Sequence, residues 1–273
     1  MDKELFFTEN RQKFIISGKD FYSIMIKVGN IKIGVGKPKI CVPITAVTLK
    51  QALEQTKYIA NDLGADVDLV EFRIDYLKDA KNPEFLMDAL KQVKEALNNM
   101  PLLCTFRTLK EGGEMMVSDD EYEEILLHCI QSEAIDLIDA EIFRGADVFQ
   151  RIVSEAHKKN IFVIGSSHDF SNTPAKDEMV SRLMMIEREG ADIAKLAVMP
   201  KDREDVLALL NACSIAQTCM DIPFIAISMG KLGMISRFSG ELLGSCITFG
   251  AGTKASAPGQ IAAGKLREIL ELL

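Results

Sequence analysis

Short apolar runs recur along the chain at intervals of about thirty residues, the length of one strand–helix unit. They begin near Ile40, Leu69, Pro101, Asp136, Ile161, Ile193, Pro223 and Ile247. Short runs with few polar positions are typical of strands that are buried on both faces of a parallel sheet. The pattern therefore predicts eight buried strands.

Between these runs, apolar residues recur at the spacing of amphipathic helices. The clearest predicted helices span 49–62, 121–132, 146–159 and 178–189. Pro83 suits the first turn of another helix, and Gly64 and Gly190 suit helix ends. Strands that alternate with helices, with no linker between them, predict an α/β fold of the (β/α)8 or TIM-barrel type. An open, doubly wound sheet is the structural alternative.

The N-terminal region has a different pattern. Residues 24–33 alternate apolar and polar side chains around a Gly29-Asn30 turn, which predicts a β-hairpin. We expect this hairpin, within residues 21–36, to close the N-terminal mouth of the barrel. Residues 1–20 carry no usable pattern, so the sequence leaves the order of this N-terminal extension undefined. The predicted organisation is this extension followed by one barrel domain, 21–273, that includes the hairpin.

Composition narrows the classes of function. The 273 residues are 48% hydrophobic, ample for a large core, and the net charge of −8 argues against a nucleic-acid or membrane partner. No apolar run reaches transmembrane length and the first residues lack signal-peptide features, so we expect a cytoplasmic protein. Six cysteines without a CxxC pair and three histidines without ligand spacing predict reduced thiols and no metal site.

Two residues suggest the chemistry. Lys195 interrupts a buried apolar strand, where burial disfavours its cation and would leave an amine able to attack a carbonyl. His168, at the end of the preceding predicted strand, could move protons for that amine. Imine catalysis in a barrel is therefore the first hypothesis.

Structural interpretations of both residues remain open. Lys195 could instead be the buried salt-bridge partner of Glu141 or Asp139. His168 and Asp169 could form a structural hydrogen bond or a helix cap. Neither residue alone decides between structure and catalysis.

Polar residues also gather at or near the ends of other predicted strands. In a barrel, the carboxyl ends of all strands open onto one common site. Besides His168 and Lys195, the candidates in chain order are Glu71, Arg73, Asp75, Arg107, Glu111, Asp139, Glu141, Arg237, Ser256 and Gln260. Their clustering at one end of an apolar series is a stronger signal than any single member.

Taken in order, these segments resemble the type I 3-dehydroquinate dehydratases of the shikimate pathway. The resemblance covers the chain from about Lys37 to the C-terminus. The motifs that carry it are Glu71-Phe72-Arg73, Phe106-Arg107-Thr108, Glu111-Gly112-Gly113-Glu114, His168-Asp169-Phe170, Lys195-Leu196-Ala197-Val198-Met199-Pro200, Ser236-Arg237 and Ser256-Ala257-Pro258-Gly259-Gln260. Each motif is weak alone, but their shared order is specific.

The resemblance implies a barrel enzyme that removes water from 3-dehydroquinate to give 3-dehydroshikimate, a step of aromatic amino acid and chorismate biosynthesis. It implies that Lys195 forms the imine, that His168 is the general acid and base, and that Glu111 supports His168. It implies no cofactor, no metal and a homodimer. The implied substrate-binding residues are Arg237, Ser256 and Gln260 for the carboxylate, and Glu71, Arg73 and Arg107 for the ring hydroxyls.

The chemistry asks for these residue types independently. An iminium accepts the electrons released when a proton leaves the neighbouring carbon, and a histidine can carry that proton. An arginine fork matches a carboxylate. We also expect the loop 252–260, which has few large apolar groups, to close over the bound carboxylate.

Two other functions remain open. Residues 250–255 match the GxGxxA dinucleotide fingerprint, although no strand follows to complete the unit that the fingerprint requires. The loop after the eighth strand is also a common phosphate site in barrels, so an imine-forming aldolase of sugar phosphates is the alternative enzyme. A barrel retained as a binding module is the non-enzymatic alternative. The presence of Lys195, His168 and Glu111 together argues against it.

Overall fold

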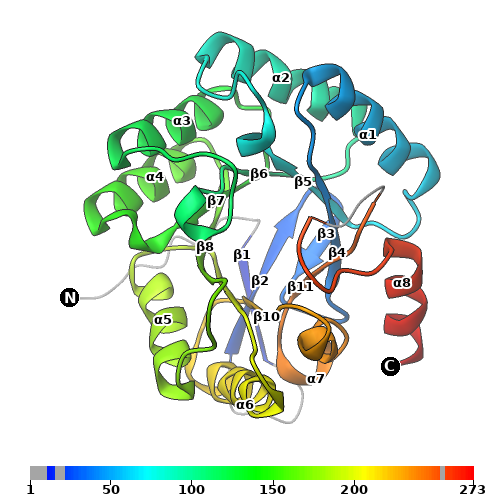
Figure 1. Cartoon of the computed structure of the whole chain (residues 1–273), viewed down its shortest axis with the longest axis vertical. Helices are drawn as coiled ribbons and strands as arrows, with labels where there is room; N and C mark the ends of the chain where they lie inside the picture. The colour runs from blue at the N-terminus through cyan, green and yellow to red at the C-terminus, as the bar shows by residue number, and fades with distance from the viewer. Residues whose placement is uncertain (1–10, 16–21, 253–255) are drawn as a thin grey trace.

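The computed structural model describes residues 11–15, 22–252 and 256–273, with side chains from Met25 onward. Its main body is a barrel of parallel strands enclosed by helices (Figure 1). In chain order the barrel strands are β4 (Lys39–Ile44), β5 (Leu69–Arg73), β6 (Leu102–Thr105), β7 (Leu137–Glu141), β8 (Phe162–Asp169), β9 (Ile193–Val198), β10 (Phe224–Ser228) and β11 (Ile247–Phe249). Each begins within one residue of its predicted start.

Strand pairing confirms the TIM barrel and excludes the open sheet. The order runs from β10 through β9, β8, β7, β6, β5 and β4 to β11, so the last barrel strand pairs with the first. The remaining seam between β10 and β11 is bridged where the backbone N–H of Cys246 donates to the carbonyl of Phe224 at 2.8 Å. An open doubly wound sheet would leave two free edges instead.

Helices follow the strands around the barrel. They are α1 (Leu49–Asp62), α2 (Pro83–Ala96), α3 (Asp119–Gln131), α4 (Ala146–Lys158), α5 (Lys176–Arg188), α6 (Arg203–Cys219), α7 (Gly240–Leu243) and α8 (Ala263–Leu272). Helix α3 begins two residues before its predicted start because Ser118 and Glu121 form a reciprocal capping box. Pro83 occupies the first turn of α2, as predicted.

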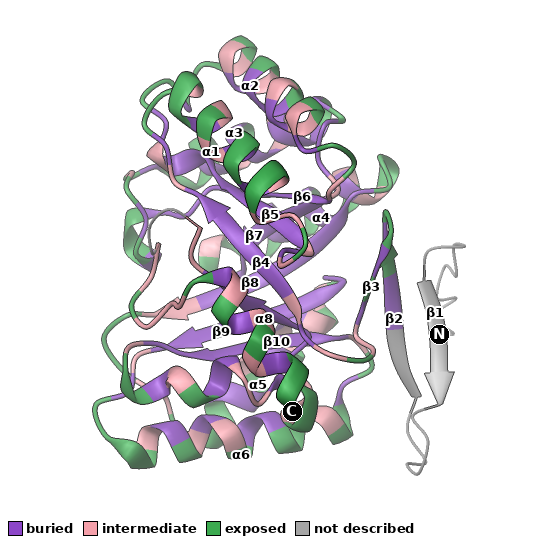
Figure 2. Ribbon diagram, turned by 90° about the vertical axis from the view of Figure 1, so that its right-hand side faces the viewer, coloured by how far each residue is buried: buried purple, intermediate pink, exposed green. Residues whose placement is uncertain are grey.

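The predicted N-terminal hairpin is present. Strands β2 (Tyr22–Val28) and β3 (Ile31–Ile33) meet at the Gly29-Asn30 turn, and β1 (Arg11–Ile15), which the sequence did not predict, pairs with β2. Figure 2 shows β2 and β3 lying across one end of the barrel. Their buried side chains pack on the inward residues near the strand starts, Leu69 and Leu103 among them. The hairpin therefore closes the N-terminal mouth.

Two apolar layers hold this arrangement together. One fills the barrel interior and continues into the hairpin, while the other lies between the strands and the outer helices. Five of the six free cysteines are buried and Cys219 is exposed. No helix in the described ranges is long and apolar enough to cross a membrane. Those ranges also contain no cluster of three histidine, cysteine or acidic side chains that could hold a metal ion.

Candidate active site

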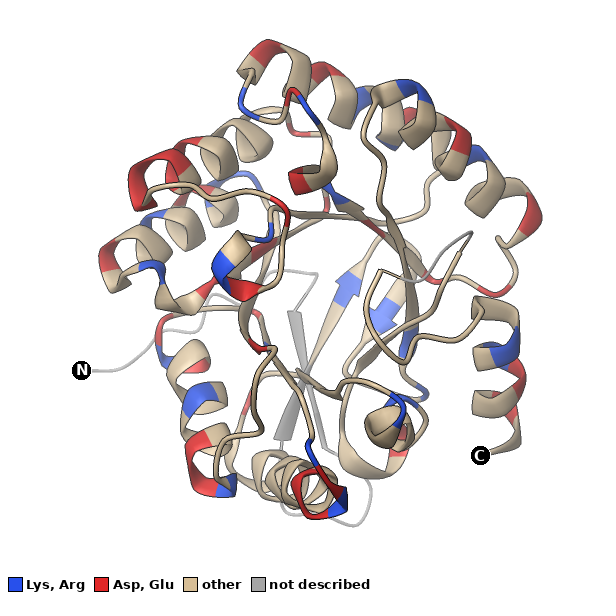
Figure 3. Cartoon of the chain, in the orientation of Figure 1, with Lys and Arg blue, Asp and Glu red and all other residues tan. Residues whose placement is uncertain are grey.

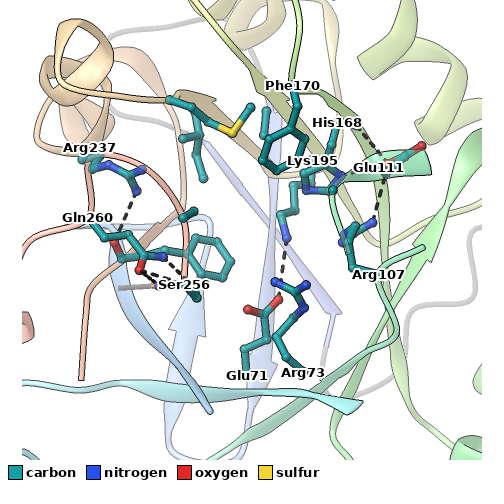
Figure 4. A pocket seen from close by; sticks show the side chains of 16 residues that line it. Glu71, Arg73, Arg107, Glu111, His168, Phe170, Lys195, Arg237, Ser256 and Gln260 are labelled. Atoms are coloured by element: carbon teal, nitrogen blue, oxygen red, sulfur yellow. Dashed lines mark hydrogen bonds and ion pairs between the residues drawn. The ribbon is translucent and has the colours of Figure 1, made fainter. Parts of the chain in front are cut away.

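One cavity opens at the carboxyl ends of the strands, with a volume of about 560 Å³ including the part open to solvent. Figure 3 shows charged positions on the barrel strands and the segments after them, in addition to the outer helices. The structure brings all nine predicted site residues to this cavity (Figure 4). They are Glu71, Arg73, Arg107, Glu111, His168, Lys195, Arg237, Ser256 and Gln260. The rest of the lining is largely apolar.

Lys195 is buried deep in the cavity, at the middle of β9 rather than at its end. Its Nζ lies 3.2 Å from Asp139 Oδ2, 3.9 Å from Glu71 Oε1 and 4.7 Å from the centre of the Phe249 ring. The salt bridge considered for Lys195 therefore exists, and its nearest partner is Asp139. Glu141 instead bonds to the backbone and hydroxyl of Thr108.

Asp139 is held as a carboxylate by its surroundings. Burial alone would raise the pKa of Asp139, but the Arg107 and Lys195 cations and a hydrogen bond from Ser166 hold it below its usual value. Ser166 Oγ donates to Asp139 Oδ1 at 2.6 Å, and Arg107 Nη2 lies 2.7 Å from the same oxygen. The charge next to Lys195 is thus fixed in place from two sides.

His168 pairs with Glu111. Oε2 of Glu111 accepts the backbone N–H of His168 at 3.0 Å and lies 3.0 Å from its Nδ1. Burial, followed by the nearby Arg107 and Lys195 charges, holds the pKa of His168 well below its usual value. The imidazole is therefore neutral near pH 7, and its Nε2, the nitrogen away from Glu111, is available to accept a proton. Asp169 instead accepts the backbone N–H groups of the following turn.

Glu111 itself is in an unfavourable place for a charge. Burial and the neighbouring Glu141 raise the pKa of Glu111 to about 8, against the lowering effect of Arg107. Gly112, directly after it, has a φ of +83°, a left-handed conformation that favours glycine. A Cβ at Gly112 would lie 2.3 Å from the Phe170 ring. The Glu-Gly-Gly sequence thus allows the loop to pack closely against the strand that carries His168.

Arg237 is a buried cation that has no acidic partner among the described residues. Its guanidinium donates to two backbone carbonyls, Phe249 at 3.3 Å and Pro258 at 3.0 Å. Among the described residues no carboxylate lies within ion-pair distance, and burial lowers the pKa of Arg237 to about 10. An anionic ligand would supply the missing charge.

Ser256 and Gln260 lie beside Arg237 along the same side of the cavity (Figure 4). The Ser256 backbone N–H donates to Gln260 Oε1 at 2.8 Å, and Gln260 Nε2 donates to Ser256 Oγ at 3.0 Å. Ser256 and Gln260 therefore satisfy each other's hydrogen-bonding groups, and a ligand would have to replace some of these hydrogen bonds. Residues 253–255 of the loop expected to close lie outside the described residues.

The three residues expected to face the ring hydroxyls, Glu71, Arg73 and Arg107, differ in how many hydrogen bonds and ion pairs they already form within the protein. Arg73 donates twice to Asp75 at 2.8 Å, whereas within the described residues Glu71 accepts only the Thr105 hydroxyl, at 2.9 Å. Arg107 contacts three acids and Ser166; burial alone would lower the pKa of Arg107, but those acids hold it well above its usual value. Glu71 therefore retains the most capacity for a ligand.

Sequence reasoning left two structural contributors out of the predicted site. Asp139 was noted among the polar residues at the strand ends and as a possible salt-bridge partner of Lys195 but was given no role in the site, although Asp139-Ala140-Glu141 repeats the charged–apolar–charged pattern of Glu71-Phe72-Arg73. That alternation within a buried strand was the available signal. Phe249 had no comparable signal, because an aromatic residue in a buried strand is ordinarily part of the core.

Known proteins share the sequence and the fold of this chain. A family model described as type I 3-dehydroquinase matches residues 40–273. The chain belongs to this family. The predicted family and class of enzyme, a lyase of the dehydratase type in the shikimate pathway, are thereby confirmed.

Individual relatives are similar in sequence to this chain along nearly its whole length. The 3-dehydroquinate dehydratase of Listeria welshimeri is 45% identical over 251 residues, which cover 91% of this chain and 97% of the relative. That of Lactiplantibacillus plantarum is 46% identical and covers 90% and 96%.

Solved structures give the same result. A type I 3-dehydroquinate dehydratase from Clostridium difficile, solved with covalent modified comenic acid, is 41% identical with a TM-score of 0.88 and covers 92% of this chain and 98% of that chain. The enzyme from Enterococcus faecalis is 39% identical with a TM-score of 0.85 and covers 91% and 99%.

Proposed function

We propose that this chain converts 3-dehydroquinate to 3-dehydroshikimate through an imine on Lys195, with His168 as general acid and base. The observation that carries the proposal is the content of one cavity: a buried lysine, a neutral histidine and an arginine to which the described part of the chain offers no counter-ion. The family and the names of the relatives support the substrate. The relatives are named as dehydratases, which favours this reaction over the aldolase alternative.

The charge of Arg237, unpaired within the described residues, defines where the substrate carboxylate binds. The carboxylate of 3-dehydroquinate pairs with Arg237, and Ser256 and Gln260 add hydrogen bonds from the same side of the cavity. This placement directs the ring and its carbonyl toward Lys195. Glu71, which has free capacity, accepts hydrogen bonds from the ring hydroxyls.

The first chemical stage forms the iminium. His168 takes a proton from Lys195, and the freed amine adds to the carbonyl carbon while the carbonyl oxygen, which receives the second amine proton, becomes the hydroxyl of a carbinolamine. His168 gives the proton that it took from Lys195 to that hydroxyl, which leaves as water. The carbon–nitrogen double bond that forms carries a positive charge on nitrogen.

The second stage removes the ring hydroxyl. Nε2 of His168 takes a proton from the carbon beside the iminium, and the electron pair moves toward nitrogen to give an enamine. The enamine expels the β-hydroxyl, which His168 protonates to water, and this restores a conjugated iminium. Hydrolysis consumes one water and releases the enone, so the net reaction loses one water and no cofactor takes part.

Reductive trapping tests the proposal. Borohydride added to the enzyme with 3-dehydroquinate should reduce the iminium and add a ligand-sized mass to the peptide that contains Lys195. Enone formation, followed by ultraviolet absorbance, should stop in parallel. Enzyme without substrate is the control. Full inactivation that leaves this peptide unmodified would overturn the imine mechanism.

The remaining expectations concern assembly and location. The homodimer, the cytoplasmic location and the lack of nucleic-acid partners stay predictions, and sedimentation at micromolar concentration would test the first of them.

A further inference from the structure

Asp139 is the acid nearest to the Lys195 amine, and the mechanism above gives it no part. Its Oδ2 lies 3.2 Å from Nζ, while Oδ1 accepts from Ser166 at 2.6 Å and faces Arg107 at 2.7 Å. The residue has no exposed surface and does not line the cavity. Both carboxylate oxygens are engaged by protein groups, so substrate cannot bind to them directly.

Glu71 is the competing acid, and its position differs. It is 3.9 Å from Lys195 Nζ, lines the cavity and has capacity for a ligand. Asp139 is closer, lies behind the amine and is fixed by two other residues. Asp139 is therefore suited to act on the nitrogen of Lys195, and Glu71 to act on the substrate.

We propose that Asp139 is a further catalytic residue, the counter-ion that keeps the imine nitrogen on Lys195 protonated. This inference rests on the proposed imine mechanism. A protonated imine draws electrons from the neighbouring carbon far better than a neutral imine, but a water-poor cavity disfavours the cation. A fixed carboxylate beside the nitrogen reverses that preference. The Phe249 ring, 4.7 Å from Nζ, favours the cation in the same direction.

The test is Asp139→Asn, which keeps the shape of the side chain and removes its charge. We expect kcat to fall by roughly 10²–10³-fold, the scale of losing one preorganised electrostatic group. KM should change by less than about threefold, because Asp139 does not touch substrate. Borohydride should also trap less Lys195 adduct per unit time in a single turnover than in the wild-type enzyme.

Glu141→Gln is the matched control. Glu141 lies two residues further along β7, is equally buried and pairs with the same Arg107 at 3.1 Å, but it does not contact Lys195. The substitution removes the same charge from the same network. We expect a lower melting temperature and a fall in kcat of less than about tenfold.

Three outcomes separate the possibilities. If the wild-type enzyme forms no adduct, the imine mechanism fails and Asp139 loses its role with it. If the wild type forms the adduct but Asp139→Asn keeps its kcat, only the counter-ion inference is wrong. Equal losses of kcat in Asp139→Asn and Glu141→Gln would assign the effect to the Arg107 network and overturn the inference as well.

Ser166→Ala keeps the inference testable if Asp139→Asn does not fold. It removes the 2.6 Å hydrogen bond to Asp139 without changing any charge. We expect kcat to fall by about three- to tenfold at nearly constant KM, the cost of one buried hydrogen bond. An unchanged kcat in this variant would contradict the role of Asp139.

Discussion

At the amino ends of the barrel strands, three aspartates repeat one arrangement. Asp68, Asp136 and Asp192 each stand one residue before a strand, and each accepts a backbone N–H near the start of the preceding strand at 2.7 to 2.8 Å. Each also pairs with a basic side chain from a helix. The basic partners are Arg267 at 2.7 Å, Lys94 at 2.5 Å and His157 at 2.9 Å, respectively.

The carboxyl ends carry the same residue types in a different balance. There Arg107 is shared among Glu111, Asp139 and Glu141, while Arg237 has no acid within ion-pair distance in the described part of the chain. At the amino end each acid has a backbone donor and a base of its own. The comparison shows that a charge whose partners are complete supports the fold, whereas a buried charge whose partners are incomplete is available to a ligand.

Substituting one lysine at each end would test this contrast most strongly. Lys195→Ala should lower turnover by at least roughly 10⁴-fold, the scale of deleting a covalent nucleophile. Lys94→Ala should leave turnover unchanged and lower the melting temperature, because Asp136 loses its ion pair. Ultraviolet assays and thermal unfolding measure both. Comparable losses of turnover in Lys195→Ala and Lys94→Ala would contradict the assignment of catalysis to the carboxyl ends and of stability to the amino ends of the strands.

Two histidines provide the next comparison. His168→Ala should slow enone formation by about 10²–10⁴-fold and let a covalent Lys195 adduct accumulate, since the amine remains but the proton carrier is gone. His157→Ala, at the amino end beside Asp192, should keep normal turnover and unfold at a lower temperature. Mass spectrometry of the intact protein during turnover detects the adduct. A His168→Ala enzyme with near wild-type rate would transfer the acid–base role to another residue, Glu111 first.

Two arginines should give stability changes of opposite sign. Arg237→Met removes a buried cation that no acid in the described ranges pairs with, so the empty protein should melt at a higher temperature while product binding weakens by at least about 30-fold. Arg267→Met breaks the pair with Asp68 and should lower the melting temperature without affecting binding. Calorimetry gives both quantities. A fall in stability for Arg237→Met would mean that its carbonyl contacts outweigh its unpaired charge.

Most of the fold could be predicted because its signals are local. Apolar runs such as 40–44 and 193–198 are too regular to be loops, and the capping and turn residues mark the ends of the elements between them. Strand β1 was missed because its five residues, Arg11–Ile15, do not alternate in polarity. A strand without this alternation leaves little trace in its own sequence.

The site was predictable as a set of residues but not as a network. Parallel strands place their carboxyl ends together, so Lys195 and His168 could be assigned to one cavity from the chain order. The choice of Asp139 over Glu141 as the partner of Lys195 depends on register and side-chain direction, to within an ångström. The absence of an acid near Arg237 among the described residues depends on the same details of register and side-chain direction. Sequence patterns do not contain this information.

A pH-dependent effect on stability is expected at Glu111, a buried acid at the carboxyl ends of the strands. Its pKa is about 8 in the folded protein against 4.5 as the ordinary value, chiefly because of burial. Between these values the unfolded chain releases a proton that the folded protein retains. The contribution of Glu111 to stability therefore falls as pH rises from about 4.5 to about 8, by on the order of 1.4 kcal/mol per pH unit.

Glu111→Gln removes this titration and keeps the size of the side chain. The melting temperature of the variant minus that of the wild type should increase between pH 5 and pH 8, by roughly 5 °C or more for a chain of this size. Taking the difference between the two proteins at each pH cancels the groups that titrate alike in both. Thermal unfolding at four or five pH values measures it. A difference that stays flat, or that declines toward pH 8, would show that Glu111 is ionised in the folded protein and stabilised by Arg107 and His168, as the acids at the amino end are by their own partners.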